Sequence, residues 1–108
     1  IEELDLILKN IKECPSIDLI GVTGGEPMLY PDLVEHIINF DYGRKVGITI
    51  KTNGFWGKDI NKARNFIERN KSKIKMISFS YDQFHKEFID LQNILNIVDI
   101  ANDLEVST

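Results

Sequence analysis

A carboxylate follows two adjacent glycines at Gly24-Gly25-Glu26, directly after a short apolar run at residues 19–22, and Pro27 comes next. Adjacent glycines allow a ligand to approach the backbone closely, while proline restricts the turn and removes one backbone donor. A carboxylate beside open backbone carbonyls presents hydrogen-bond acceptors only. The segment therefore suits an ammonium group, and it lacks the Lys and Ser or Thr of a phosphate-binding loop. The alternative is an ordinary strand-to-helix turn with a solvated Glu26.

Two other polar segments follow apolar runs in the same way. Residues 51–57 (Lys-Thr-Asn-Gly-Phe-Trp-Gly) follow the β-branched run 46–50, and residues 80–83 (Ser-Tyr-Asp-Gln) follow the run 74–79. Ligands of α/β sheets bind beyond the carboxyl ends of parallel strands. If the three runs are parallel strands, all three polar segments lie on one rim.

The segments between these runs have helical spacing. Apolar residues recur at intervals of three and four over 4–11, 33–40 and 60–67, and the third of these helices is expected to begin at Lys58 or Asp59. A long last helix is expected to bury Phe84, Phe88, Leu91, Leu95 and Val98, and a fourth strand to begin at Glu105. Strands that alternate with helices predict an α/β fold with a parallel sheet.

Composition sets broad limits on the class of protein. The chain has 108 residues, of which 43% are hydrophobic, so it forms one domain at most. No apolar run approaches the ~20 residues of a membrane span, so we expect no membrane partner. The single cysteine, Cys14, rules out an internal disulfide framework. We expect the Cys14 side chain to be buried or half-buried as a small apolar group, and we expect the protein to be cytoplasmic. Both ends look truncated.

Charge is unevenly distributed along the chain. Ten basic and two acidic residues lie between Arg44 and Lys75, although the net charge is −4. A basic block is typical of some nucleic-acid surfaces, but these residues form no tight stripe. We interpret the block as a solvated helix with its flanking loops, and we do not expect nucleic acid as a partner.

The motif Thr23-Gly24-Gly25-Glu26-Pro27, with Thr52-Asn53-Gly54 and residues 78–82 (Ser-Phe-Ser-Tyr-Asp) after the next two strands, resembles the radical S-adenosylmethionine (radical SAM) enzymes. The resemblance covers essentially the whole chain. It implies part of a (β/α)6 partial TIM-type barrel, with residues 1–108 a fragment of a single radical SAM core domain.

The resemblance also implies roles for individual residues. Gly24, Gly25 and Glu26 would hold the ammonium of S-adenosylmethionine and Pro27 would shape the turn. Thr52 and Asn53 would face the methionine carboxylate or the substrate, and Ser80 and Asp82 would lie near the ribose hydroxyls. The residue types leave other readings open: Asn53 as a turn residue with left-handed φ, Thr52 as a plain strand-end hydroxyl, and Asp82 as a helix cap. Phe55 and Trp56 either form a substrate lip or pack the loop onto the sheet.

One feature of the family is missing from the chain. Radical SAM enzymes bind a [4Fe–4S] cluster through three cysteines, usually spaced C-x3-C-x2-C, and only Cys14 is present. The cluster ligands are therefore expected outside this chain, and we expect no metal ligand within it. His36 and His85 are too isolated for a metal site.

The resemblance implies an oxidoreductase as the parent protein. Such an enzyme reductively cleaves S-adenosylmethionine at its iron–sulfur cluster to give a 5′-deoxyadenosyl radical, which abstracts hydrogen from a peptide, protein or small-molecule substrate. A reductant protein would supply the electron, and the fragment alone would be inactive. Two other hypotheses are a non-catalytic binding or scaffold module with a degenerate radical SAM fold, and an RNA-modifying enzyme.

Overall fold

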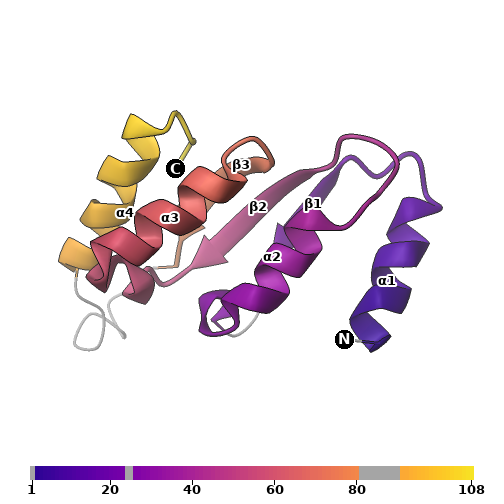
Figure 1. Cartoon of the computed structure of the whole chain (residues 1–108), viewed down its shortest axis with the longest axis horizontal. Helices are drawn as coiled ribbons and strands as arrows, with labels where there is room; N and C mark the ends of the chain where they lie inside the picture. Colours follow the sequence, from indigo (N-terminus) through magenta and orange to yellow (C-terminus); the bar gives the residue numbers. More distant parts are fainter. Residues whose placement is uncertain (1, 24–25, 81–90) are drawn as a thin grey trace.

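The computed structural model describes residues 2–23, 26–80 and 91–108, and within them helices and strands alternate along the chain (Figure 1). In chain order the elements are α1 (Glu2–Lys12), β1 (Leu19–Val22), the short 3-10 helix η1 (Pro27–Leu29), α2 (Pro31–Asn39), β2 (Gly47–Thr52), the 3-10 helix η2 (Phe55–Lys58), α3 (Ile60–Asn70), β3 (Ile74–Phe79) and α4 (Leu91–Asp103). The predicted α/β class and the positions of the first three of the four predicted strands are confirmed.

The three strands form one parallel sheet in the order β1-β2-β3. Val22 pairs with Ile50 and Thr52 pairs with Phe79, so the carboxyl ends of the strands are aligned. The expected fourth strand is represented by a single parallel bridge between Met76 and Ser107. The chain therefore continues beside β3 after α4, in the direction that the prediction required.

The helices pack on one face of this sheet. Ile48, Ile50 and Ile77 are fully buried and form one hydrophobic cluster with side chains of α2, α3 and α4, among them Val34, Phe66 and Ile97. On the same side of β1, Ile20 packs against the cluster around Leu8 of α1. Lys51 and Met76 lie on the other face of the sheet and are exposed. The four described helices thus form a single layer, with α1 at one end of the molecule and α4 at the other (Figure 1).

Local sequence accounts for the start of α3. The Asp59 side chain accepts a hydrogen bond from the backbone N–H of Lys62 at 3.1 Å, which satisfies one of the unpaired donors of the first helical turn. The helix therefore begins where the sequence predicts.

The buried face of α4 differs from the prediction. Ile94, Ile97 and Ile100 are buried, whereas Leu91 and Leu95 are 50% and 46% exposed. The buried set, which also includes Ala101, has steps of three and four residues like the predicted set, so hydrophobic spacing alone does not separate them. The packing of η2 decides between them, because Gly54 and Gly57 lie against the side of the helix that carries the isoleucines. Phe84 and Phe88 lie outside the described residues.

Arg44 ties the end of α1 to the loop before β2. Its guanidinium nitrogens donate hydrogen bonds of 2.6–3.3 Å to five backbone carbonyls, those of Ile11, Lys12, Cys14, Ile17 and Tyr42. A helix leaves its last carbonyls without internal partners, and a cation there also interacts favourably with the helix dipole. Arg44 therefore acts as a C-terminal cap for α1 from a distant part of the chain.

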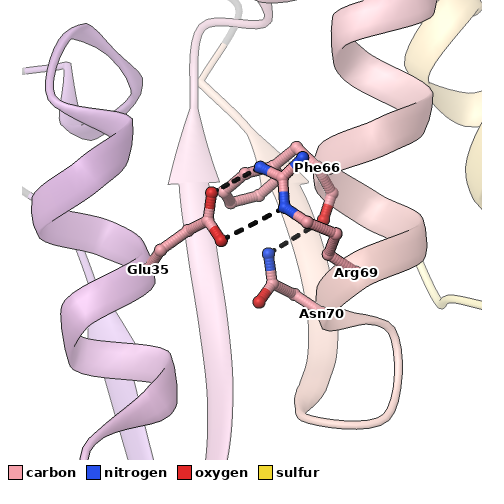
Figure 2. Close-up of polar contacts among 4 residues, drawn as sticks. All are labelled: Glu35, Phe66, Arg69 and Asn70. Carbon is pink, nitrogen blue, oxygen red and sulfur yellow. Dashed lines mark hydrogen bonds and ion pairs between the residues drawn. The ribbon is translucent and has the colours of Figure 1, made fainter.

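An ion pair joins α2 to α3. Arg69 donates to the two carboxylate oxygens of Glu35 at 2.5 and 3.4 Å, and Figure 2 shows the two side chains reaching toward each other between the helices. The Arg69 hydrogen bond lowers the pKa of Glu35 below its ordinary value and raises that of Arg69. Next to the pair, the buried Asn70 amide donates to the Phe66 carbonyl at 2.9 Å (Figure 2).

None of the helices in the described ranges is both long enough and apolar enough to cross a membrane.

Arg44→Ala should lower the free energy of unfolding by about 1.5–3 kcal/mol, because it removes charge-assisted hydrogen bonds to several carbonyls at once. Arg44→Lys should recover less than half of the loss, since an ammonium cannot span carbonyls that a planar guanidinium reaches. The neighbouring exposed Lys45→Ala is the matched control and should lie within about 0.5 kcal/mol of wild type. Urea unfolding followed by circular dichroism measures all three. Equal midpoints for Arg44→Ala and Lys45→Ala would contradict this role.

The Glu35–Arg69 pair predicts a small dependence of stability on pH. Because the folded-state pKa of Glu35 is lowered, its contribution is fully present above the unfolded value of about 4.3 and is lost as the pH falls through the folded value. The contribution at pH 7 should be below about 1 kcal/mol, since Arg69 is largely exposed.

The stability difference between wild type and Glu35→Gln should therefore shrink between pH 7 and pH 3. Urea unfolding at several pH values measures this difference. The exposed Glu68→Gln on α3 serves as the control and should show a smaller change. A difference for Glu35→Gln that grows on acidification would refute the assignment.

Candidate functional site

The carboxyl ends of the three strands bring residues from all three predicted segments together. Glu26 follows β1, Thr52 ends β2 and Asn53 follows it, and Ser80 follows β3. The backbone N–H of Ser80 donates to the Thr52 carbonyl at 2.9 Å, which continues the sheet by one further bond. The expected common rim is present for these four residues. Gly24, Gly25, Asp82 and His85 lie outside the described residues.

The Glu26 carboxylate is held by donors from two loops. Its Oε2 accepts from the Met28 backbone N–H and from the Thr52 hydroxyl, each at 2.8 Å, and its Oε1 accepts from the Asn53 N–H at 2.6 Å. The Met28 bond caps η1, in which Pro27 occupies the first position. A carboxylate has about four acceptor positions. Among the described residues these three donors take three of the positions, and the fourth is on Oε1.

Thr52 is the link between this carboxylate and the loop after β2. The residue is 1% exposed, and its hydroxyl accepts hydrogen bonds from the Gly54 N–H at 3.2 Å and from the Trp56 indole N–H at 2.9 Å. The same hydroxyl donates to Glu26. Thr52 is thus a strand-end hydroxyl that is fully hydrogen-bonded within the protein.

Asn53 forms a local turn in addition to its contact with Glu26. Its side-chain oxygen accepts from the Phe55 N–H at 2.9 Å, an interaction typical of Asn in turns. Asn53 is thus a turn residue, as one of the two open readings has it, but the left-handed φ of this loop belongs to Gly54, at +84°, and not to Asn53. A β-carbon at Gly54 would also lie 2.6 Å from the Ile94 side chain.

The two aromatic residues of the loop have different environments. Trp56 packs edge-to-face on Phe66 of α3, with ring centroids 5.7 Å apart, and is hydrogen-bonded to Thr52. Trp56 therefore packs the loop onto the core, as one of the two predicted readings has it. Phe55 is 39% exposed.

A groove of about 860 Å³ lies between α2 and α3, beside η1 and η2. Its lining includes the apolar side chains of Met28, Trp56 and Phe66 and the charged side chains of Asp32 and Lys62. No motif in the sequence signals this groove, because its walls come from elements that are separate in the chain.

Gly57 allows η2 to pack directly against α4. A β-carbon there would lie 2.0 Å from the Asn93 carbonyl oxygen and 2.9 Å from the Ile97 side chain. The Asn96 amide donates to the Gly57 carbonyl at 3.1 Å, which fixes the contact. In the sequence, Gly57 is recognisable only as part of the rim segment, and nothing near it signals this contact.

The described residues do not fit an iron–sulfur cluster. They contain no group of three or more His, Cys, Asp or Glu side chains that could hold a metal ion. Cys14 lies in the turn before β1, at the end of the strand opposite Glu26, and it is exposed. The expectation of a buried or half-buried Cys14 is wrong, because the turn after α1 faces solvent. His36 lies 2.5 Å from Asp5 and joins α2 to α1.

Comparison with known proteins gives one informative similarity. No protein-family model matches the chain. The chain is 27% identical over 96 residues to YydG of Bacillus subtilis (strain 168), whose name assigns it to peptide biosynthesis. The alignment covers 85% of this chain, so it must include residues 23–82, where the motifs after the three strands lie. The chain spans about 30% of the length of YydG. This similarity agrees with the resemblance carried by the rim motifs.

Gly57→Ala should lower the free energy of unfolding by at least about 2 kcal/mol, because the new methyl group meets backbone atoms of α4 that cannot move aside. Gly21→Ala is the matched control: the nearest atom is the Thr49 hydroxyl at 3.4 Å, and alanine is slightly favoured over glycine in a strand. It should be neutral within about 0.5 kcal/mol. Urea midpoints measure both variants. If they unfold together, the close contact between η2 and α4 is not present in solution.

Proposed function

We propose that this chain, which is of the radical SAM type, supplies part of the S-adenosylmethionine site of a larger enzyme. The observation that carries the proposal is the Glu26 carboxylate, which is held at the sheet rim by three donors and, within the described part of the chain, keeps one acceptor position on Oε1. An ammonium group needs such an acceptor and gains from the negative charge. The chemistry of the site therefore fits the amino group of the methionine moiety.

The other rim residues are proposed to complete this site. The Asn53 side-chain amide would face the methionine carboxylate or the substrate, and Ser80, which is exposed beside Thr52, would lie near the ribose hydroxyls. Gly24 and Gly25 would bring the backbone close to the ammonium, and Asp82 would join Ser80. On this proposal every one of these residues binds or orients, and none is an acid or a base.

The one-sided helix layer supports a barrel as the complete fold. Doubly wound sheets carry helices on both faces, whereas a barrel carries them on the outside only. All four described helices pack on the face of Ile48, Ile50 and Ile77. We propose that residues 1–108 are part of a single (β/α)6 core domain, with the opposite face of the sheet turned inward.

The proposed reaction belongs to the parent protein. S-adenosylmethionine, when bound there, would supply the 5′-deoxyadenosyl radical that abstracts hydrogen from a substrate. The described residues do not fit the [4Fe–4S] cluster, so its ligands are proposed to lie outside this chain.

A peptide is the substrate class that we propose, because the name of YydG assigns that relative to peptide biosynthesis. A reductant protein is the proposed electron source, and the cytoplasm is the proposed compartment. The basic segment does not favour nucleic acid: Arg44 caps α1, Arg64 pairs with Asp103, Arg69 pairs with Glu35 and Lys73 bonds Asn39. Several basic side chains of residues 44–75 are therefore engaged in contacts within the protein.

Glu26→Gln in the intact, cluster-loaded parent should weaken S-adenosylmethionine binding by about 10–100-fold, since a hydrogen bond to a charged group is worth about 1.5–3 kcal/mol. Glu35→Gln, which alters a carboxylate on α2 away from the rim, should leave the affinity unchanged. Anaerobic calorimetry measures binding, and 5′-deoxyadenosine production reports the reaction. Equal affinities for wild type and Glu26→Gln would overturn the proposal. Complete absence of binding and product would favour the non-catalytic module instead.

A further inference from the structure

The Thr52 hydroxyl has no hydrogen-bonding capacity left for a ligand. A hydroxyl group has one proton and two acceptor positions. The Gly54 N–H and the Trp56 indole N–H occupy both acceptor positions, so the single proton is directed to Glu26 Oε2. Because Thr52 is 1% exposed, water has no access that would let the hydroxyl turn elsewhere.

The arrangement also distinguishes the two oxygens of Glu26. Oε2 receives the Thr52 hydroxyl and the Met28 N–H, which together use both of its acceptor positions. From the residues that the structure describes, Oε1 receives one hydrogen bond, that of the Asn53 N–H. The chain of contacts therefore determines which oxygen remains available to an incoming cation.

The indole that begins this chain of contacts is itself held by the helix layer. Its ring packs on Phe66, and the next residue, Gly57, lies against the backbone of α4. Rotation of the Trp56 ring would break its bond to Thr52 and disturb that packing at the same time. A rigid donor at this position keeps the hydroxyl in one orientation, as preorganised binding sites require.

We infer that Thr52 and Trp56 are positioning residues for Glu26: the indole N–H orients the Thr52 hydroxyl, and the hydroxyl fixes the carboxylate so that Oε1 faces the ligand. In this role, Thr52 and Trp56 affect the ligand only through the position of Glu26. The part of the inference that concerns S-adenosylmethionine rests on the function proposed above, whereas the hydrogen-bond chain from Trp56 to Glu26 does not.

The hydrogen-bond chain is tested without any ligand. The 108-residue sequence contains one tryptophan. In a nitrogen–proton NMR spectrum of the intact protein, the signal of the Trp56 indole N–H is the one that disappears in Trp56→Phe. In Thr52→Val, which keeps the side-chain shape and removes the hydroxyl, this indole proton should exchange with solvent at least 10-fold faster. Thr52→Ser, which keeps the hydroxyl, should stay close to wild type. Unchanged exchange in a folded Thr52→Val protein would overturn the inference.

The effect on the site is tested by S-adenosylmethionine affinity in the cluster-loaded parent. Thr52→Val and Trp56→Phe should each weaken binding about 3–10-fold, and Thr52→Ser should restore it. Phe66→Leu removes the ring contact but keeps the indole N–H, so it should weaken binding less than Trp56→Phe. Equal losses for these two variants would show that packing, not the hydrogen bond, matters, and would overturn the inference.

A double-mutant cycle separates the two proposals. If Thr52 acts through Glu26, then Thr52→Val combined with Glu26→Gln should bind no more weakly than Glu26→Gln alone. Additive losses would mean that Thr52 acts independently of Glu26, contrary to the inference. If Glu26→Gln changes nothing, the proposed function fails, while the indole exchange result still decides the hydrogen-bond chain.

Discussion

The face of the central strand β2 that packs against the helices runs from the core to the rim. Ile48 and Ile50 on this face are fully buried, and Thr52, the next residue on the same face, is almost as deeply buried but carries a hydroxyl. A polar group at such a position must be hydrogen-bonded within the protein. It is bonded to Glu26 on one side and to the loop after β2 on the other. The rim carboxylate is therefore held by the strand that organises the core.

Close approach between backbone segments is the second constraint. The loop after β2 lies against α4 because Gly54 adopts a left-handed conformation and Gly57 leaves room for the Asn93 carbonyl. This contact places the isoleucine face of α4 on the sheet. In the same loop, Trp56 packs against Phe66 of α3. The helix layer and the candidate site are in this way parts of one packed unit, whereas Lys51 and Met76 on the other face of the sheet are exposed.

Local patterns predicted the elements well, since each depends on neighbouring residues. The first three strand runs, the helical spacing before β1, β2 and β3 and the start of α3 near Asp59 appear where the sequence indicates. Predictions that depended on packing were less successful. The spacing of α4 fits two adjacent stripes, and the exposure of Cys14 depends on which way the turn after α1 faces. Neither property is encoded in residue types near those positions.

The sequence by itself determined the residue types at the rim and the order of helices and strands, because hydrophobic period and turn chemistry act over a few residues. It also indicated that Glu26, Thr52 and Ser80 would share one edge, since parallel strands align their carboxyl ends. Only the tertiary structure decided which groups bond to which. The bonds from Thr52 and Asn53 to Glu26 span 26 and 27 positions, and the register of β1 against β2 together with the packing of Trp56 on Phe66 sets their geometry.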